Sequence, residues 1–229
     1  WSLQSQKIEH NSSKKTIYYK NATLKVYDFP IFFFPRFSHP DPTVKRASGF
    51  LTPAFNDNAN TGPGIQLPYY WVVSDDKDFT FTPKMYAQEK LLLLTEYRQD
   101  FKKSKLIVDT GYTQGFKKDG PKKSKGSRSH FFSNFTVDLS DDQGSTSDFE
   151  LQIQQVNSES YVKTHNIQTA LVDNENNILE NNLSYHFHQN DTFFDAEVSS
   201  YEDISKVGRK KYEYVFPHLT YGKNILTSD

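Results

Sequence analysis

Two pairs of polar residues have a spacing that could support chemistry, and both lie in the last third of the chain. His186 and His188 alternate along a predicted strand and so point to one side of it, a geometry that zinc can use. Asp195 and Glu197 repeat the spacing with two carboxylates, the groups that glycosidases use. No third ligand is tied to the histidines, acidic residues are scattered over many strands, and no GxSxG, P-loop or dinucleotide fingerprint occurs. We therefore predict no catalytic residue, no metal and no cofactor.

Composition excludes several classes of protein. The 229 residues include 27 basic and 28 acidic ones, so the net charge of −1 gives no general case for binding nucleic acid. The absence of Cys excludes disulfides and thiolate metal sites. Hydrophobic residues make up only 35% and the mean hydropathy is −0.74, yet 15% of residues are aromatic. Such a chain has little aliphatic filling and many residues suited to pleated surfaces and membrane interfaces.

From Ser48 onward, apolar and polar residues alternate in one extended segment after another. The clearest case sets Phe149, Leu151 and Ile153 against Glu150 and Gln152. Similar alternation recurs around residues 79–86, 106–113, 130–139, 183–188, 193–199 and 212–216. The segments approach the roughly 9–11 residues of a tilted membrane strand. A soluble sandwich would share the alternation, but the fully polar second face and the aromatics near strand ends favour an outer-membrane barrel.

The connections between these segments alternate in length from the fifth strand onward. Long connections at residues 117–129, 157–182 and 202–211 are separated by short ones at 140–147 and 189–191. Outer-membrane barrels have short periplasmic turns and long external loops. The pattern therefore predicts that the long loops lie at the cell exterior.

Residues 1–28 predict short strands with a period of two, and a proline-rich stretch follows them. This stretch, VYDFPIFFFPRFSHPDPTVKRASGFLTP, covers residues 26–53. It contains an aromatic cluster and, before the final Pro53, four closely spaced prolines: Phe29, Phe32, Phe33, Phe34 and Phe37, with Pro30, Pro35, Pro40 and Pro42. Because proline has no N–H and restrains the residue before it, we expect these prolines to break any continuous strand and form a hinge. Pro53 and Pro68 fall inside the first two predicted strands after the hinge, where they indicate an edge, a bulge or a weak seam.

The order of these motifs resembles the LptD family, also called organic solvent tolerance proteins. The resemblance rests on DFPIFFFPRFSHPDPTVKRASGFLTP, on Leu67-Pro68-Tyr69-Tyr70-Trp71 and on Thr80-Phe81-Thr82-Pro83-Lys84-Met85-Tyr86, and it covers roughly residues 16–100. It implies an all-β fold in which the end of a periplasmic β-jellyroll leads into the first ~10 antiparallel strands of a large outer-membrane β-barrel. The implied domains are 1–35 for the jellyroll strands, 36–47 for the hinge and 48–229 for the barrel part, so we expect a piece of a longer protein.

The same resemblance implies a function and partners. LptD proteins insert lipopolysaccharide (LPS) into the outer leaflet of the outer membrane, without being enzymes. The resemblance implies a lateral gate at Pro53 and Pro68, and a lipid passage along the aromatic and proline residues of 29–42. It also implies two protein partners, an LptE-like lipoprotein plug and an LptA-like periplasmic bridge protein. The expected location is the outer membrane, with the N-terminal part in the periplasm.

A basic run precedes the sixth barrel strand. Its cations are Lys117, Lys118, Lys122, Lys123, Lys125 and Arg128. A solvated hairpin loop is the simplest interpretation. The functional alternative is contact with LPS phosphates, worth about 1 kcal/mol per cation near a charged surface. The run has no interleaved aromatics of the kind that bind nucleic acid.

Two other functions fit the strand pattern without the proline-rich motif. A substrate-specific porin or receptor barrel would share the alternation, and single-channel conductance would distinguish it. A secreted glycan-binding β-sandwich would dissolve without detergent. The membrane interpretation further predicts that Phe149, Leu151 and Ile153 do not lie in a closed dry interior.

Overall fold

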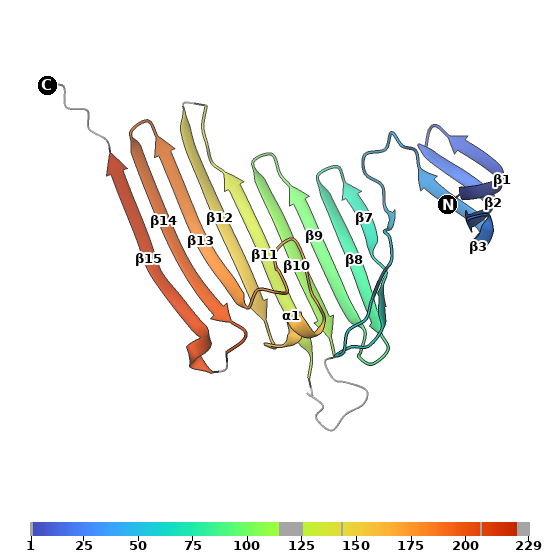
Figure 1. Ribbon diagram of the computed structural model, residues 1–229. Helices are drawn as coiled ribbons and strands as arrows, with labels where there is room; N and C mark the ends of the chain where they lie inside the picture. Colours follow the sequence, from blue (N-terminus) through green and yellow to red (C-terminus); the bar gives the residue numbers. More distant parts are fainter. Residues whose placement is uncertain (1, 115–125, 143, 207, 224–229) are drawn as a thin grey trace. The chain divides into compact units, whose positions relative to one another are not determined.

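The computed structural model describes residues 2–114, 126–142, 144–206 and 208–223, and the chain divides into two compact units, Trp1–Ser48 and Gly49–Asp229. Both units consist almost wholly of antiparallel strands (Figure 1). The all-β prediction is therefore confirmed. No helix in the described part of the chain is long and apolar enough to cross a membrane.

The first unit is a three-stranded antiparallel sheet. Its strands are β1 (Ser2–Asn11), β2 (Thr16–Val26) and β3 (Phe29–Pro40), in that spatial order. The apolar alternation changes phase between Tyr19 and Ala22, where Asn21 adopts a positive φ of 51°. This local bend lets Tyr19, Ala22 and Leu24 face the same ring-bearing side of β3, where they pair with Phe37, Phe34 and Phe32.

Strand β3 corrects one prediction from the sequence. The prolines were expected to interrupt any continuous strand, but β3 runs through Pro30 and Pro35 to Pro40. Residues 36–40, predicted as hinge, are therefore part of this strand. Proline is tolerated here because, in the part of the chain that the structure describes, β3 pairs with β2 alone, so a missing N–H on its other side breaks no bond within the sheet.

The second unit is one broad sheet of twelve segments. These are β4 (Gly49–Phe50), β5 (Ala54–Asn56), β6 (Gly64–Gln66), β7 (Tyr69–Ser74), β8 (Lys77–Tyr86), β9 (Leu92–Asp100), β10 (Ser104–Thr113), β11 (Arg128–Asp138), β12 (Ser145–Val156), β13 (Ile178–Gln189), β14 (Thr192–Asp203) and β15 (Tyr212–Lys223). From β8 to β15 each strand pairs with its neighbour in sequence, as Figure 1 shows.

The twelve segments form ten strands. Segments β6 and β7 both pair with β8, so together they form one strand with a break. Segments β5 and β4 pair with β6 and β7 respectively, so β4 and β5 form another broken strand. Twelve segments less two breaks leave ten strands, in agreement with the sequence. The sheet is open, with the first strand at one edge and β15 at the other.

The pairing register aligns the alternation of neighbouring strands into two faces. Phe79 pairs with Tyr97, and Leu151 pairs with Leu183, so side chains of one kind continue across the sheet. The apolar face carries Trp71, Phe79, Phe81, Leu106, Val108, Phe131, Phe135, Val137, Phe149, Leu151, Ile153, Leu183, Tyr185, Phe194, Val198 and Leu219.

The apolar face is not a dry core. Leu183 and Val198 are each 43% exposed and Leu219 is 66% exposed. Phe149, Leu151 and Ile153 are only half-buried. A face so apolar and so uncovered suits contact with a non-aqueous environment.

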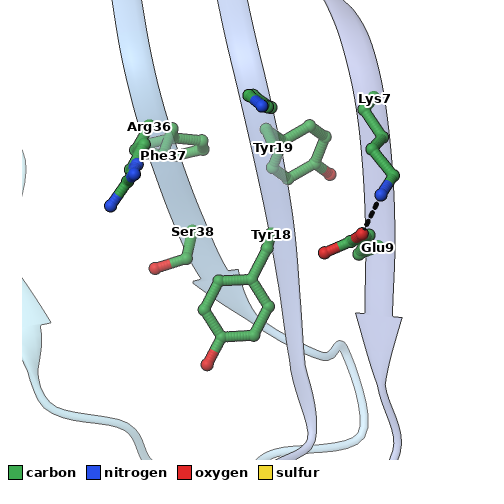
Figure 2. Close-up of a pocket in the computed structure, with 8 residues that line it drawn as sticks. Lys7, Glu9, Tyr18, Tyr19, Arg36, Phe37 and Ser38 are labelled. Atoms are coloured by element: carbon green, nitrogen blue, oxygen red, sulfur yellow. Dashed lines mark ion pairs between the residues drawn. The ribbon is translucent and has the colours of Figure 1, made fainter.

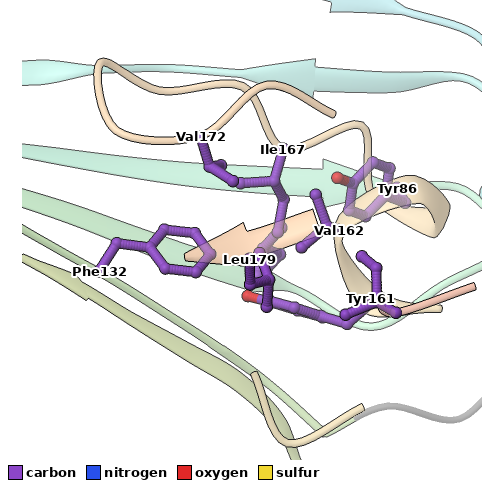
Figure 3. Packing of buried hydrophobic residues seen from close by; sticks show 9 residues of the cluster. Tyr86, Phe132, Tyr161, Val162, Ile167, Val172 and Leu179 are labelled. Atoms are coloured by element: carbon purple, nitrogen blue, oxygen red, sulfur yellow. The ribbon is translucent and has the colours of Figure 1, made fainter. Parts of the chain in front are cut away.

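The buried core of the second unit lies on the opposite, polar face, at one end of the sheet. Residues 158–177, here called the covering segment, fold back over this face and include the short helix α1 (Tyr161–Thr164). Tyr161, Val162, Ile167 and Val172 from the segment pack with Tyr86, Leu92, Phe132, Leu179 and Ile204 (Figure 3). The sequence predicted a long external loop over 157–182, whereas β13 begins at Ile178 and the residues before it are packed on the sheet.

Candidate functional site

Prolines break the first two strands of the broad sheet at neighbouring levels. Pro53 lies in the gap between β4 and β5, and Pro68 lies in the gap between β6 and β7. Three residue pairs join β5 to β6 and two join β4 to β7, whereas twelve join β13 to β14. Between the two short ladders, one backbone bond crosses the gap, from Leu51 N to Pro68 O at 2.9 Å.

This geometry makes the first hairpin the least extensively paired part of the sheet among the described residues. A proline cannot donate a ladder hydrogen bond, and each such bond contributes about 0.5–1.5 kcal/mol net. In an apolar environment, an unpaired backbone group costs several kcal/mol, so pairing that is already missing lowers the cost of separating the strands. The weak seam at Pro53 and Pro68 stays a prediction, and the broken ladders are the observation on which it rests.

The polar face of the sheet carries a network of charged and amide groups. Arg98 Nε lies 2.8 Å from Asp78 Oδ1 and 3.4 Å from Glu96 Oε1. Farther along, Asn134 Nδ2 donates to Glu150 Oε1 at 2.6 Å, and Asn182 Nδ2 donates to Glu197 Oε1 at 2.9 Å. Each pair satisfies part of its partner's hydrogen-bonding capacity, and the remaining carboxylate oxygens can accept from water or hydroxyl groups. This face is therefore suited to water and hydroxyl groups and unsuited to apolar chains.

A buried hydrogen-bond chain holds the covering segment to the polar face. His130 Nε2 lies 3.1 Å from Asp109 Oδ1, and His130 Nδ1 lies 3.2 Å from the Tyr161 hydroxyl. In the neutral imidazole, donation from Nε2 to the carboxylate leaves Nδ1 to accept from the tyrosine. Burial and the nearby Asp109 raise the pKa of Tyr161, which keeps its hydroxyl protonated.

The covering segment also reaches both sides of this contact. Tyr86 donates from its hydroxyl to His165 O at 3.3 Å, and Asn58 Nδ2 donates to Thr164 O at 3.3 Å. On the other side, Gln154 Nε2 donates to Leu171 O at 2.5 Å. The segment therefore spans the polar face from the first loop to β12.

A protein-family model described as "LptD protein" matches residues 17–226. The chain belongs to the LptD family. The match includes both proline-broken strands of this LptD chain and most of its first unit.

Curated relatives agree with the family model. The chain is 37% identical over 98 residues to the LPS-assembly protein LptD of Shewanella sp. (strain ANA-3), a match covering 43% of this chain and 13% of the relative. It is 33% identical over 92 residues to the protein of that name from Francisella tularensis subsp. novicida (strain U112), covering 40% and 10%. This LptD chain thus matches about a tenth to an eighth of the length of these curated relatives.

The aromatic residues predicted to line a lipid passage lie on β3 of the first unit. Phe32, Phe34 and Phe37 form a row, with ring centroids 6.3 Å apart for the first two and 5.6 Å for the last two. Phe33 pairs with Thr23 and Phe29 lies at the start of the strand, and both are exposed. Pro30, Pro35 and Pro40 lie in the same strand, and Pro42 follows it.

The opposite side of this small sheet is polar. Lys7 and Glu9 of β1 form an ion pair beside Tyr18 of β2 and Arg36 and Ser38 of β3, around a shallow hollow of about 510 Å³ (Figure 2). Lys7 is the main cause of the lowered pKa of the Glu9 carboxyl. The first unit is therefore two-sided, with the row of Phe32, Phe34 and Phe37 on one side and Lys7, Glu9 and Arg36 on the other.

The structure pairs the polar residues of β13 and β14 with each other. His186 Nδ1 lies 2.8 Å from Asp195 Oδ1 on the neighbouring strand, and Glu197 accepts from Asn182. Residues 2–114, 126–142, 144–206 and 208–223 contain no group of three or more His, Cys, Asp or Glu that could hold a metal. Of the basic run, Lys117, Lys118, Lys122, Lys123 and Lys125 lie outside the described residues, and Arg128 begins β11.

Sequence reasoning missed the covering segment. Its apolar residues Tyr161, Val162, Ile167, Leu171 and Val172 are too many for a solvated loop and lack the period of a strand. This high apolar content was the signal in the sequence that the segment is packed and not a solvated loop.

Proposed function

We propose that this LptD-family chain serves in the transport and assembly of LPS at the outer membrane, as the name of its curated relatives indicates for them. The proposal extends to the route: LPS enters the outer leaflet through a lateral gate formed by the first two strands. The observation that carries it is the pair of ladder breaks at Pro53 and Pro68 in a sheet with one apolar and one polar face.

LPS is an amphiphile, and the two kinds of surface match its two parts. The ring row of β3 offers a non-polar path for acyl chains in the periplasmic part, consistent with a jellyroll that conducts lipid. The polar face of the second unit offers hydrogen-bonding groups to the sugar. The seam at Pro53 and Pro68, within the second unit, lets acyl chains leave sideways while the sugar stays hydrated. Each part of LPS thus avoids the desolvation that a single environment would impose.

The proposed partners follow from the same assignment. An LptE-like lipoprotein plug would contact the polar face, and an LptA-like bridge protein would deliver LPS to the periplasmic unit. Both are proposals from the family.

A double substitution in the full-length protein tests the gate. Replacing Pro53 and Pro68 with alanine restores two N–H donors to the broken ladders, so the seam should tighten and surface LPS should fall severalfold. Surface LPS can be quantified by labelling intact cells, with protein level and heat-modifiable mobility as controls for folding. Unchanged surface LPS with a folded double variant would remove the gate from the proposal and leave family membership intact.

A further inference from the structure

A third proline, Pro83, lies beside the two breaks. It belongs to β8, which is continuous from Lys77 to Tyr86. On the side of the second strand, the pairing of β8 stops at Gln66↔Lys84 and resumes at Tyr69↔Phe81. Thr82 and Pro83 therefore lie opposite the break at residues 67 and 68.

The three prolines form one row across three strands. Ala54 pairs with Gln66, so Pro53 lies next to the level of Leu67 on the first strand. On the third strand Pro83 lies opposite Leu67, and on the second strand Pro68 lies one residue past that level, opposite Thr82. The row runs across the sheet, perpendicular to the strands.

The missing donor of Pro83 faces the second strand. Leu67 N donates to Pro83 O at 3.2 Å. In an antiparallel ladder, the N–H and C=O of one residue point toward the same neighbouring strand. The Pro83 ring therefore replaces an N–H that would have faced the carbonyl of Leu67.

The missing donor of Pro68 faces the first strand by the same reasoning, because Pro68 O accepts from Leu51 N. The second strand thus lacks one hydrogen bond to the first strand, because Pro68 has no N–H to donate. It lacks another to β8, because Pro83 has no N–H to donate to Leu67 O.

The weakening ends at β8. Pairing of β8 with β9 runs without a shift from Lys77↔Gln99 to Lys84↔Leu92 and includes Pro83↔Leu93. Since the Pro83 carbonyl points away from β9, its missing N–H removes no bond there. Proline is normally excluded from a strand with neighbours on both sides, but here the hydrogen bonds between β8 and β9 are kept.

We infer that Pro83 is a positioning residue of the lateral gate, and this inference rests on the proposed function. Pro83 releases the second strand from β8 at Leu67, next to Pro68, so the first two strands bend together along the row Pro53, Pro68 and Pro83. The moving part of the gate is then the hairpin of residues 49–74, and β8 is its fixed border.

The test is the Pro83→Ala substitution in the full-length protein, with Thr82→Ala as the matched control. Pro83→Ala supplies an N–H within reach of the Leu67 carbonyl, whereas Thr82→Ala leaves every backbone donor unchanged. We expect amide deuterium exchange in residues 64–74 to slow about fivefold, the factor equivalent to one net backbone bond of about 1 kcal/mol. Surface LPS should fall in Pro83→Ala cells and stay at the parental level in Thr82→Ala cells.

A second variant and the gate substitutions separate the outcomes. If Pro83→Ala fails to fold, as judged by heat-modifiable mobility, Pro83→Val offers the same donor with a better strand former. The role of Pro83 is overturned if Pro83→Ala matches the Thr82→Ala control in amide exchange or in surface LPS. If the Pro53 and Pro68 double variant still lowers surface LPS, the proposed gate itself is unaffected. If the double variant has no effect either, the proposed function itself is wrong.

Discussion

Gly111 is the residue whose missing side chain makes room for the covering segment. A Cβ at this position would lie 2.5 Å from His130 Cε1 and 2.5 Å from the Tyr161 hydroxyl. No real Cβ contact is so short, so the hydrogen-bond chain from Asp109 through His130 to Tyr161 depends on glycine here.

We expect Gly111→Ala to displace Tyr161 and loosen the covering segment. Overpacking of this kind costs about 1–3 kcal/mol. Limited proteolysis of the folded full-length protein should show faster cleavage within residues 158–177. The control is Gly49→Ala, because nothing lies within 4 Å of a Cβ at Gly49. Equal cleavage rates in the two variants would contradict the packing argument.

His165 should make the covering segment sensitive to acid. Burial lowers the pKa of His165 to about 4, with Arg128 and Lys84 contributing, and its ring packs against Tyr86 and Tyr161. A released His165 takes up a proton near the ordinary histidine pKa of 6.5, whereas the packed one does so only near 4. Since the released state binds more protons between these values, packing weakens as pH falls from 6.5 toward 4, by up to about 1.4 kcal/mol per pH unit.

The measurement is the cleavage rate within the covering segment as a function of pH. It should rise below pH 6.5 in the parental protein. His165→Gln removes the titrating ring, so its profile should be flatter over the same range. Identical slopes in the two proteins would mean that another group controls the pH response.

At the scale of elements, the covering segment is held by apolar contacts more than by its own secondary structure. Its helix α1 has only four residues, and its Ser160 N-cap makes no side-chain capping bond. Such a short helix is marginal by itself, so burial of Val162 and Ile167 must supply the stability.

Ile167→Asp should therefore detach the segment, while its neighbour Gln168→Asp should not. Ile167 is fully buried and Gln168 is exposed, so only the first substitution places a carboxylate in an apolar site. The expected loss is about 2–5 kcal/mol of packing free energy, typical of losing a large buried side chain. Cysteine labelling at a reporter position in the segment would measure the release, and equal labelling of both variants would refute it.

Elements with a regular period were predictable, whereas the proline-containing strand β3 and the covering segment were not. Strands such as β12 follow directly from alternation, because each residue's face depends only on its position along the strand. The prolines of β3 were misread because their effect depends on whether the strand has a neighbour on that side, which local sequence does not specify.

At the scale of the whole molecule, the apolar face should behave as a lipid-facing surface. Leu151 lies on this face near the middle of β12, and Gln152 lies on the polar face beside it. Leu151→Arg should destabilise the membrane-inserted full-length protein by about 2–4 kcal/mol, the cost of a cation near the bilayer midplane. Gln152→Arg should lower the free energy of unfolding much less, because residue 152 lies near Glu150 and Glu197 on the polar face. Denaturant titration in lipid vesicles measures both, and equal losses would argue against a lipid-facing role.

Sequence alone determined the alternation of faces, the number of strands and the positions of Pro53 and Pro68, since these depend on residue order. It also identified the family. Only the tertiary structure decided that the three prolines lie within one residue of a common level of the sheet, because register between strands is set by pairing that spans the turns. Likewise, only the fold showed that residues 158–177 cover the polar face, since apolar residues without a period find their partners through long-range packing.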